Sequence, residues 1–324
     1  MSDLFTNLKA TLEKQAKKKV VFPEATDERV LKAASRLAQE DIVEPILIGN
    51  INEINQLAQQ HNLEVANCTL IDPSNYAKID EIIDAFVARR NGKVSKDKAA
   101  EIVKDGNYFG TMLVYLNQAD GLVSGAAHST SDTVRPALQI IKTKEGIQKT
   151  SGVFVMVRND EKYIFADCAI NIAPTSDDLA EIAVESARTA KLFDVDPRVA
   201  MLSFSTKGSA KSKETERVIA AIDIAKEKDA SLTIDGEFQF DTAFVPEVAV
   251  KKAPDSDIKG DATVFVFPSL EAGNIGYKLA ERLGGFEAVG PILQGLNKPV
   301  NDLSRGCSEE DVYKLALITA AQSE

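Results

Sequence analysis

An α/β fold with mostly parallel strands, organised in about two domains, is predicted by three observations. Short apolar runs rich in Val, Ile and Phe alternate with stretches of helical period along most of the chain. The length of 324 residues exceeds that of a typical single domain. The composition, 44% hydrophobic and 27% charged, is that of a globular protein and not of a disordered chain.

The first part of the chain is predicted to repeat strand and helix in order. The first strand is followed by a helix for which Thr26 or Asp27 is the N-cap candidate. Further predicted strands lie at 43–49, 66–71 and 121–125 after the first at 19–23, and helices at 51–60, 79–90 and 96–104. The strand at 121–125 leads through a turn rich in small residues and hydroxyls into another helix. These repeats are typical of a parallel sheet.

A hairpin signal interrupts this pattern near the middle of the chain. Two predicted strands, 152–157 and 162–169, are separated by four polar residues, which predicts an antiparallel pair and the beginning of a second domain. Strand and helix then alternate again, and Thr175 with Asp178 forms a capping box. The later predicted strands lie at 199–204, 263–267 and 291–296, and the helices at 179–193, 214–228, 273–283 and 308–322.

Charge and cysteine content exclude several classes of protein. The chain has 38 Lys and Arg against 49 Asp and Glu, a net charge of -11, so no overall charge attracts nucleic acid or an anionic membrane. Three cysteines without a Cys-x-x-Cys pair argue against a disulfide framework and a structural zinc site. With no signal-peptide pattern and no long apolar run, we expect a soluble cytoplasmic protein.

Common nucleotide and hydrolase motifs are absent from the sequence. It contains no P-loop motif, no Gly-x-Gly-x-x-Gly and no Gly-x-Ser-x-Gly. Ligands are therefore expected at turns that follow a strand and open a helix, where backbone N–H groups can receive an anion.

The segment 298–311 concentrates chemically active side chains at one such turn. One interpretation is structural, because Ser308 and Asp311 match a Ser-x-x-Asp capping box. The other is a site for an anionic substrate, in which Arg305 grips phosphate oxygens, Ser304 donates to a developing oxyanion and Asp311 accepts a proton. Both interpretations can hold together, since a capping carboxylate can also act as a base.

Three segments in order closely resemble the phosphate acetyltransferase family. They read GAAHSTSDTVRPALQ at 125–139, FPSLEAGNIGYK at 267–278 and KPVNDLSRGCSEED at 298–311, and the resemblance spans essentially the whole chain. It implies an isocitrate/isopropylmalate dehydrogenase-like fold, in which two α/β/α domains surround a cleft that holds the active site. We expect the first domain at 1–145 plus 298–324 and the second at 146–297, in a protein that forms homodimers.

The resemblance also implies a reaction and the residues that perform it. Acetyl-CoA and phosphate would interconvert with coenzyme A and acetyl phosphate by direct thiolate attack, without a metal, a tightly bound cofactor or an acyl-enzyme. Asp311 matches the family's proposed base, and Ser304 and Arg305 match residues that stabilise the oxyanion and the leaving phosphate. The partners are these substrates of acetate metabolism, with no nucleic acid and no membrane.

The phosphates of coenzyme A need local cations in so acidic a protein. Arg135 and Arg90 match the family's coenzyme A contacts, although Arg89 is adjacent to Arg90 and a one-residue shift would exchange them. Ser129 and Thr130 are either helix caps or phosphate contacts. His128 is expected to be a hydrogen-bonded structural residue, since this mechanism does not require it.

Other interpretations stay open at this point. Cys307, beside Arg305 at a helix start, could have a lowered pKa and act as a nucleophile. A phosphate butyryltransferase would differ only in the room around the acyl group. A decarboxylating dehydrogenase would need a cluster of metal-binding aspartates, which we do not find in the sequence. A non-catalytic acetyl-CoA sensor would be free to lose Ser304, Arg305 and Asp311, so their presence favours an enzyme.

Overall fold

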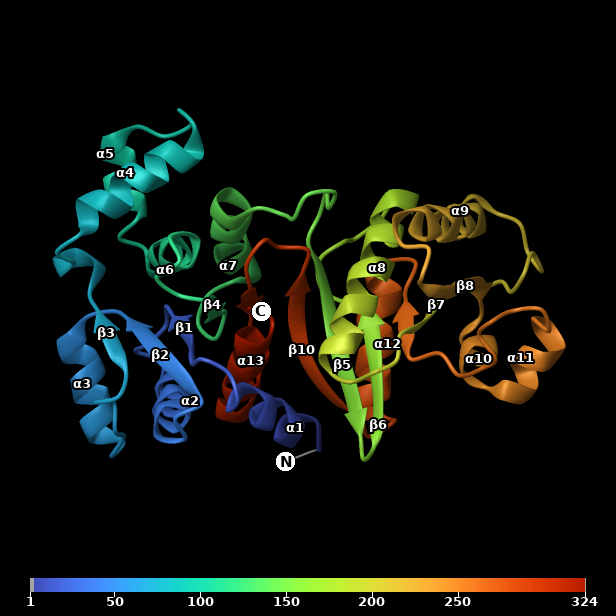
Figure 1. Ribbon diagram of the computed structural model, residues 1–324, viewed down its shortest axis with the longest axis horizontal. Coiled ribbons are helices and arrows are strands. Elements are labelled where there is room, and N and C mark those ends of the chain that lie inside the picture. The colour runs from blue at the N-terminus through green and yellow to red at the C-terminus, as the bar shows by residue number, and fades with distance from the viewer. Residues whose placement is uncertain (1–2, 324) are drawn as a thin grey trace. The chain divides into compact units, whose positions relative to one another are not determined.

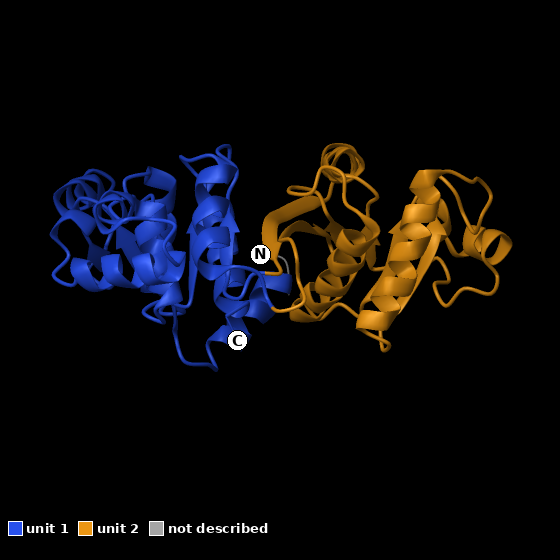
Figure 2. Cartoon of the chain, turned by 90° about the horizontal axis from the view of Figure 1, so that it is seen from above, with its two compact units in different colours: residues 1, 3–144, 296–324 blue, residues 2, 145–295 orange. Residues whose placement is uncertain are grey.

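The computed structural model describes residues 3–323, which fold as two compact units (Figures 1 and 2). Unit 1 combines residues 3–144 with the chain from 296 onward, and unit 2 comprises residues 145–295. The sequence-based boundary placed Leu296 and Asn297 in the second domain. They belong to unit 1, because the Asn297 amide donates to the carbonyl oxygens of Ile141 and Thr143 at 3.2 and 2.8 Å.

Unit 1 is built on a five-stranded sheet in the order β11-β4-β1-β2-β3. All of its neighbouring strands pair in parallel, as the alternation of strand and helix predicts. The strands are β1 (Lys18–Phe22), β2 (Val43–Ile48), β3 (Thr69–Ile71), β4 (Gly121–Ser124) and β11 (Val300–Asp302). The strand at the β11 edge comes from the C-terminal part of the chain, so unit 1 is complete only when both ends of the sequence have folded together.

Helices cover both faces of this sheet. They are α1 (Asp3–Leu12), α2 (Glu28–Gln39), α3 (Ile51–Gln60), α4 (Ile79–Arg90), α5 (Lys96–Ile102), α6 (Gly106–Tyr115), α7 (Thr130–Pro136) and α13 (Glu309–Ala321), with a 3-10 turn at Pro73–Asn75 and a π-helix at Ala137–Ile141. A Cβ atom on Gly110 of α6 would meet the Leu122 side chain, and one on Gly121 would meet Thr319 of α13. Since successive strand residues point to opposite faces, α6 and α13 lie on opposite sides of β4.

Unit 2 contains a six-stranded mixed sheet in the order β10-β5-β6-β9-β7-β8. Its strands are β5 (Ser151–Arg158), β6 (Glu161–Ala166), β7 (Arg198–Leu202), β8 (Thr233–Phe238), β9 (Val264–Val266) and β10 (Glu287–Gln294). β5 pairs antiparallel with both β6 and β10, and the other pairs are parallel. The predicted hairpin between β5 and β6 is therefore confirmed.

The helices of unit 2 also pack on its sheet, and one face holds an aromatic core. They are α8 (Ser176–Leu192), α9 (Lys213–Lys228), α10 (Phe240–Phe244), α11 (Pro246–Lys252) and α12 (Leu270–Arg282). Phe154 and Met156 of β5 belong to a buried cluster with Phe165 and Phe265, against which Ala272 and Ala280 of α12 pack. Beside this cluster lies an apolar cavity of about 590 Å³, which Phe204 and Phe240 help to line.

Some elements escape a pattern-based interpretation for physical reasons. Every residue from 109 to 114 in α6 is buried, so this helix has no polar face and no amphipathic period. β11 is only three residues long, and β8, α10 and α11 were also not predicted. Asp27, not Thr26, caps α2, because its side chain accepts the N–H of Arg29. None of the helices between residues 3 and 323 combines the length and apolar character needed to span a bilayer.

Candidate functional site

Three loops meet at one edge of the unit 1 sheet, and together with the first turns of the helices that follow them they carry most of the predicted site residues. They follow β1, β4 and β11, which are neighbours in the sheet and run parallel. Because the carboxyl ends of parallel strands lie at the same edge, residues far apart in the sequence are brought together there. The Leu303 N–H donates to the Ser124 carbonyl at 2.6 Å and fixes the β11 loop beside the β4 loop.

Asp311 lies in the first turn of α13, where it has the predicted structural role. Its Oδ2 atom accepts the backbone N–H and the hydroxyl of Ser308, both at 2.8 Å, and its own N–H donates to the Ser308 hydroxyl at 3.2 Å. The capping box is confirmed. Its other carboxylate oxygen, Oδ1, makes no hydrogen bond with any residue that the structure describes, and the side chain is exposed. One oxygen of Asp311 is therefore open to accept a proton.

Ser304 and Arg305 lie on the exposed turn just before α13. The Ser304 hydroxyl oxygen accepts the Gly306 N–H at 3.2 Å, which leaves its own hydrogen available to a ligand. The Arg305 guanidinium makes no hydrogen bond or ion pair with the part of the chain that the structure describes. Since a guanidinium binds oxyanions in a forked geometry, this turn offers an unoccupied cation to an anionic ligand.

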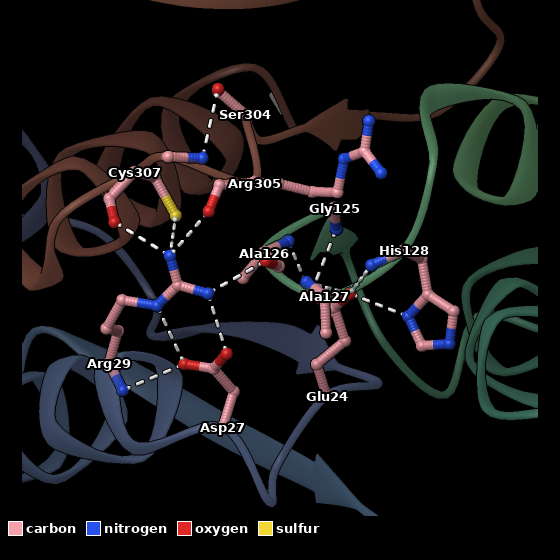
Figure 3. Close-up of polar contacts among 11 residues, drawn as sticks. Glu24, Asp27, Arg29, Gly125, Ala126, Ala127, His128, Ser304, Arg305 and Cys307 are labelled. Carbon is pink, nitrogen blue, oxygen red and sulfur yellow. Dashed lines mark hydrogen bonds and ion pairs between the residues drawn. The ribbon is translucent and has the colours of Figure 1, made fainter.

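Arg29 ties the turn before α13 to the loop after β4 (Figure 3). One guanidinium nitrogen donates to the carbonyl oxygens of Arg305 and Cys307 at 2.8 and 2.9 Å. The other donates to the Ala126 carbonyl at 2.8 Å and to the Asp27 carboxylate at 2.7 Å. The Arg29 hydrogen bond also lowers the pKa of Asp27. A single guanidinium therefore fixes the spacing of the two loops.

The buried carboxylate of Glu24 accepts hydrogen bonds from the backbone of the loop after β4 (Figure 3). Its Oε2 atom accepts the N–H groups of Gly125 and Ala126 at 2.9 and 2.8 Å. Its Oε1 atom accepts those of Ala127 and His128 at 2.8 and 2.9 Å. The Glu24 side chain is only 2% exposed. These four N–H groups are occupied by a carboxylate of the protein itself, so the backbone of this loop does not serve as an anion site.

Ser129 and Thr130 follow this loop and both have partners within unit 1. The Ser129 hydroxyl donates to Asp132 at 2.6 Å, and the Ser129 N–H donates to the same carboxylate at 3.2 Å. Thr130 hydrogen-bonds the buried Asp302, and burial raises the pKa of that carboxyl to about 6. The capping interpretation of Ser129 therefore has structural support, and the phosphate-binding role of both hydroxyls stays a prediction.

The structure gives the two adjacent arginines of α4 different contacts. Arg89 donates to the carbonyl oxygens of Ile140 and Ile141 at 2.5 and 3.1 Å, and its guanidinium lies 4.8 Å from the centre of the Tyr115 ring. Arg90 makes no such contact with the described residues. Of the two, only Arg90 has a guanidinium that is unoccupied.

Arg90 and Arg135 lie near a common neighbour, Tyr108. Burial raises the pKa of the Tyr108 hydroxyl, and the charges of Arg135 and Arg90 both oppose that rise. Arg135 is exposed in the last turn of α7. Two arginine charges that both act on one tyrosine provide the local positive charge that a polyanionic ligand needs in so acidic a protein.

Cys307 is not a low-pKa thiol. It is buried, with 8% of its surface exposed, and burial raises its pKa to about 11 although the Arg29 charge opposes the rise. The hypothesis of a nucleophilic Cys307 required a lowered pKa and was wrong in that respect. Within residues 3–323 no three His, Cys, Asp or Glu side chains are grouped so as to hold a metal ion.

Glu24, Asp27 and Arg29 were not identified from the sequence as site residues. A signal was present, because the motif Glu-Ala-Thr-Asp directly follows the first predicted strand, at the edge where ligands collect in open α/β sheets. The loop partners of Glu24 and Arg29, however, lie about a hundred and nearly three hundred residues away in the chain, which no local pattern reveals.

Comparison with known proteins gives consistent matches over the full chain. The phosphate acetyl/butaryl transferase family matches residues 4–320. A phosphate acetyltransferase from Bacillus subtilis is 67% identical over 325 residues and covers 100% of both chains. The crystal structure of a phosphotransacetylase from Streptococcus pyogenes superposes with a TM-score of 0.97 at 56% identity, over 100% of this chain and 99% of that one.

A more distant structure shows the breadth of the fold. A protein from Salmonella typhimurium described as a 4-hydroxythreonine-4-phosphate dehydrogenase aligns with a TM-score of 0.56 at 13% identity, over 95% of this chain and all of that one. At that identity the likeness concerns the fold alone. It agrees with the dehydrogenase-like α/β fold that the sequence predicts.

Proposed function

This chain belongs to the phosphate acetyl/butaryl transferase family and is an acyltransferase, and we propose that the coenzyme A thiolate takes the acetyl group of acetyl phosphate by direct attack. Its reaction is the reversible transfer of an acetyl group between acetyl phosphate and coenzyme A. The attack forms the C–S bond of acetyl-CoA and a tetrahedral oxyanion, which then expels phosphate as the C–O bond breaks. Inorganic phosphate is the second product.

Asp311 is the base in this proposal. A thiol with an ordinary pKa of about 8.5 is mostly protonated at neutral pH, so a carboxylate that takes its proton increases the reactive thiolate. The observation that carries the proposal is the geometry of Asp311, whose Oδ2 caps α13 and whose Oδ1 is unoccupied and exposed. The cap holds the carboxylate in place while the second oxygen accepts the proton.

Ser304 and Arg305 stabilise the charge that develops during attack. The Ser304 hydroxyl donates to the carbonyl oxygen of the acetyl group as it becomes an oxyanion. The Arg305 guanidinium binds the phosphate that leaves. Their support is that both side chains are exposed on the turn before α13 and that Arg29 holds the backbone of this turn at Arg305 and Cys307.

Coenzyme A is held by its phosphates in this proposal. Arg90 and Arg135 are the cations, and the occupied state of Arg89 favours Arg90 as the partner of Arg135. Ser129 and Thr130 are the additional phosphate contacts. No metal or tightly bound cofactor takes part. A cytoplasmic location is supported by three cysteines that are all free in the structure.

The decisive experiment measures release of the coenzyme A thiol from acetyl-CoA, with and without inorganic phosphate. We expect phosphate-dependent release that survives dialysis against a metal chelator and falls when butyryl-CoA replaces acetyl-CoA. Faster reaction with butyryl-CoA would make the protein a phosphate butyryltransferase. Binding of acetyl-CoA to the folded protein without any release of the coenzyme A thiol would instead support a non-catalytic acetyl-CoA sensor.

A homodimer is the remaining part of the proposal. Ile275, Leu279 and Leu283 are 58%, 53% and 83% exposed and are spaced four residues apart along α12 and its end. An exposed apolar stripe of this kind is typical of a protein interface. We expect light scattering to give twice the mass of the chain, and the double variant Leu279→Glu/Leu283→Glu to give the monomer mass. A wild-type monomer would contradict this part.

A further inference from the structure

His128 forms a pair with the buried carboxylate of Glu24 (Figure 3). The His128 Nδ1 atom lies 2.6 Å from Glu24 Oε1. Because a carboxylate that already accepts four backbone N–H groups acts as an acceptor, Nδ1 carries the hydrogen of this bond. The imidazole is 43% exposed, and its other nitrogen, Nε2, makes no hydrogen bond with a described residue. The pair therefore presents one oriented, unoccupied ring nitrogen.

This nitrogen belongs to the loop that adjoins the proposed catalytic turn. His128 directly precedes Ser129 and Thr130 in the sequence. Its loop is joined to the turn before α13 by Arg29, which donates to the carbonyl oxygens of both Ala126 and Arg305 at 2.8 Å. A Cβ atom on Gly125 would lie within 2.7 Å of the Leu303 backbone, so the two loops are in direct contact.

A structural role alone does not account for the ring. Glu24 already holds the loop through four backbone N–H groups, with lengths from 2.8 to 2.9 Å. The imidazole adds a fifth donor, while nearly half of its surface faces solvent. A carboxylate that orients an imidazole by Nδ1 and leaves Nε2 open is the arrangement that enzymes use for proton transfer.

In the proposed reaction the departing phosphate gains a proton at the stage at which Asp311 takes one from the thiol. During the attack on acetyl phosphate the thiol proton passes to Asp311. The C–O bond that breaks leaves its electron pair on phosphate, which would depart as a strongly basic trianion unless its oxygen is protonated. A general acid at this oxygen therefore lowers the barrier.

We propose that His128 is this general acid, with Glu24 as its positioning residue; the proposal rests on the proposed function. In the forward direction Nε2–H gives its proton to the departing phosphate oxygen, and the neutral imidazole remains hydrogen-bonded to Glu24. In the reverse direction neutral Nε2 takes the proton from the attacking phosphate, while protonated Asp311 returns its proton to the leaving thiolate. Solvent exchanges the two protons between turnovers.

Three variants separate proton transfer from hydrogen bonding. In His128→Asn the amide can still donate to Glu24 in place of Nδ1, but there is no Nε2. His128→Gln offers an amide near the Nε2 position that can donate a hydrogen bond but does not transfer a proton. His128→Ala removes both functions. We expect kcat to fall by about 10²- to 10⁴-fold in all three and in both directions of the reaction.

Further readouts distinguish this role from a loss of structure. The KM for coenzyme A and the thermal midpoint of His128→Asn are expected to stay close to wild type, because that variant keeps the bond to Glu24. Added imidazole is expected to increase kcat of His128→Ala in a saturable manner and to leave wild type unchanged. Wild-type turnover in His128→Asn or His128→Gln, or no response of His128→Ala to imidazole, would overturn the proposal.

The same assay keeps this inference separate from the proposed function. If wild-type protein releases coenzyme A only with phosphate and the variants retain its kcat, the role of His128 fails and the acyl transfer stands. If the wild-type protein itself shows no phosphate-dependent release, the proposed function fails first.

Discussion

Glu24 in unit 1 and Asp167 in unit 2 are buried carboxylates placed just beyond the ends of β1 and β6, and each collects the N–H groups of a loop. Glu24 accepts four N–H groups from residues 125–128. Asp167 accepts those of Gly152, Ala169, Ile170 and Asn171 at 2.8 to 3.2 Å. Both units use the same means to hold an irregular loop rigidly.

The carboxylates of Glu24 and Asp167 differ in the side chain that donates the fifth hydrogen bond to each. Asp167 accepts a bond of 2.6 Å from the Asn171 amide, which also donates to the Thr150 carbonyl at 3.0 Å. Glu24 accepts instead from His128, whose second ring nitrogen is unoccupied. An amide closes the network in unit 2, whereas an imidazole leaves a proton-transferring atom at the surface of unit 1. A rigid loop is therefore not a functional site by itself. Whether it can take part in proton transfer depends on the side chain that it presents.

The largest expected effect tests whether proton transfer belongs to unit 1. Asp311→Asn keeps an oxygen that can cap α13 but removes the base, so we expect kcat to fall by about 10²- to 10⁴-fold with little change in the KM for coenzyme A. Ser308→Ala is the matched control, because it loses the hydroxyl bonds of the cap at a cost of about 1 kcal/mol in the free energy of unfolding but keeps the backbone N–H that holds Asp311 Oδ2. Unchanged turnover in Asp311→Asn would remove the base from unit 1.

The next test compares the two carboxylates directly through Glu24→Gln and Asp167→Asn. Each substitution replaces an accepting oxygen by an NH₂ group that faces N–H donors, so each is expected to lower the free energy of unfolding by about 1–3 kcal/mol. Only Glu24→Gln is expected to lower kcat as well, by about 10²-fold, because it displaces the loop that carries His128. Urea titration and steady-state kinetics measure both effects. An equal loss of kcat in the two variants would break the comparison.

A smaller effect on the KM for coenzyme A tests whether Arg90 or Arg89 is the cation that binds its phosphates. Arg90→Gln is expected to increase the KM for coenzyme A by about tenfold, the value of one charge-assisted hydrogen bond to phosphate. Arg89→Gln loses its bonds to Ile140 and Ile141 and should reduce stability instead. Comparison of coenzyme A with its 3′-dephospho form identifies the phosphate involved. The reverse outcome for the two arginines would exchange their roles.

Asp302 is a third buried carboxylate of the protein, and its pKa is raised by burial. Burial raises the pKa of Asp302 from 3.8 to about 6. Because its pKa is higher in the folded state, Asp302 stabilises the fold at low pH, and this contribution is lost as pH rises from about 4 through 6. Asp302→Asn should therefore be more stable than wild type at pH 8 by roughly 3 kcal/mol, with the gap closing near pH 4. Urea titrations at both pH values check this, and a gap independent of pH would contradict it.

The smallest effect concerns Cys307. Cys307→Ala is expected to leave turnover close to wild type, because the buried thiol with a pKa of about 11 is protonated at the pH of the assay. Alkylation of Cys307 by iodoacetamide should accelerate steadily from pH 7 to 10 without a plateau near neutrality. A large loss of activity in a folded Cys307→Ala protein would restore the nucleophile hypothesis.

Features that depend on neighbours in the chain could be predicted from the sequence. The capping boxes at Thr175 and Ser308 involve side chains three residues apart, and both are present. The β5–β6 hairpin depends on a four-residue turn signal and is also confirmed. The sequence did not predict elements whose local pattern is weak, such as α6, in which residues 109–114 are all buried, and the three-residue β11. Asp311, Ser304 and Arg305 could be named as candidate site residues because they lie together in one short segment that resembles a family motif.

The alternation of strands and helices, the family and the segment that contains Asp311 could all be predicted from the sequence, because periodicity, caps and long motifs are encoded in consecutive residues. Which side chains are engaged in hydrogen bonds and which are available to a ligand depends on the tertiary structure. It brought Glu24 and Arg29 to loops about a hundred and nearly three hundred residues away, since adjacent parallel strands place their carboxyl ends at one edge. The tertiary structure also gives Arg89 hydrogen bonds that Arg90 lacks, and it raises the pKa of Cys307 by burial. Hydrogen bonding and desolvation depend on what surrounds a side chain in space.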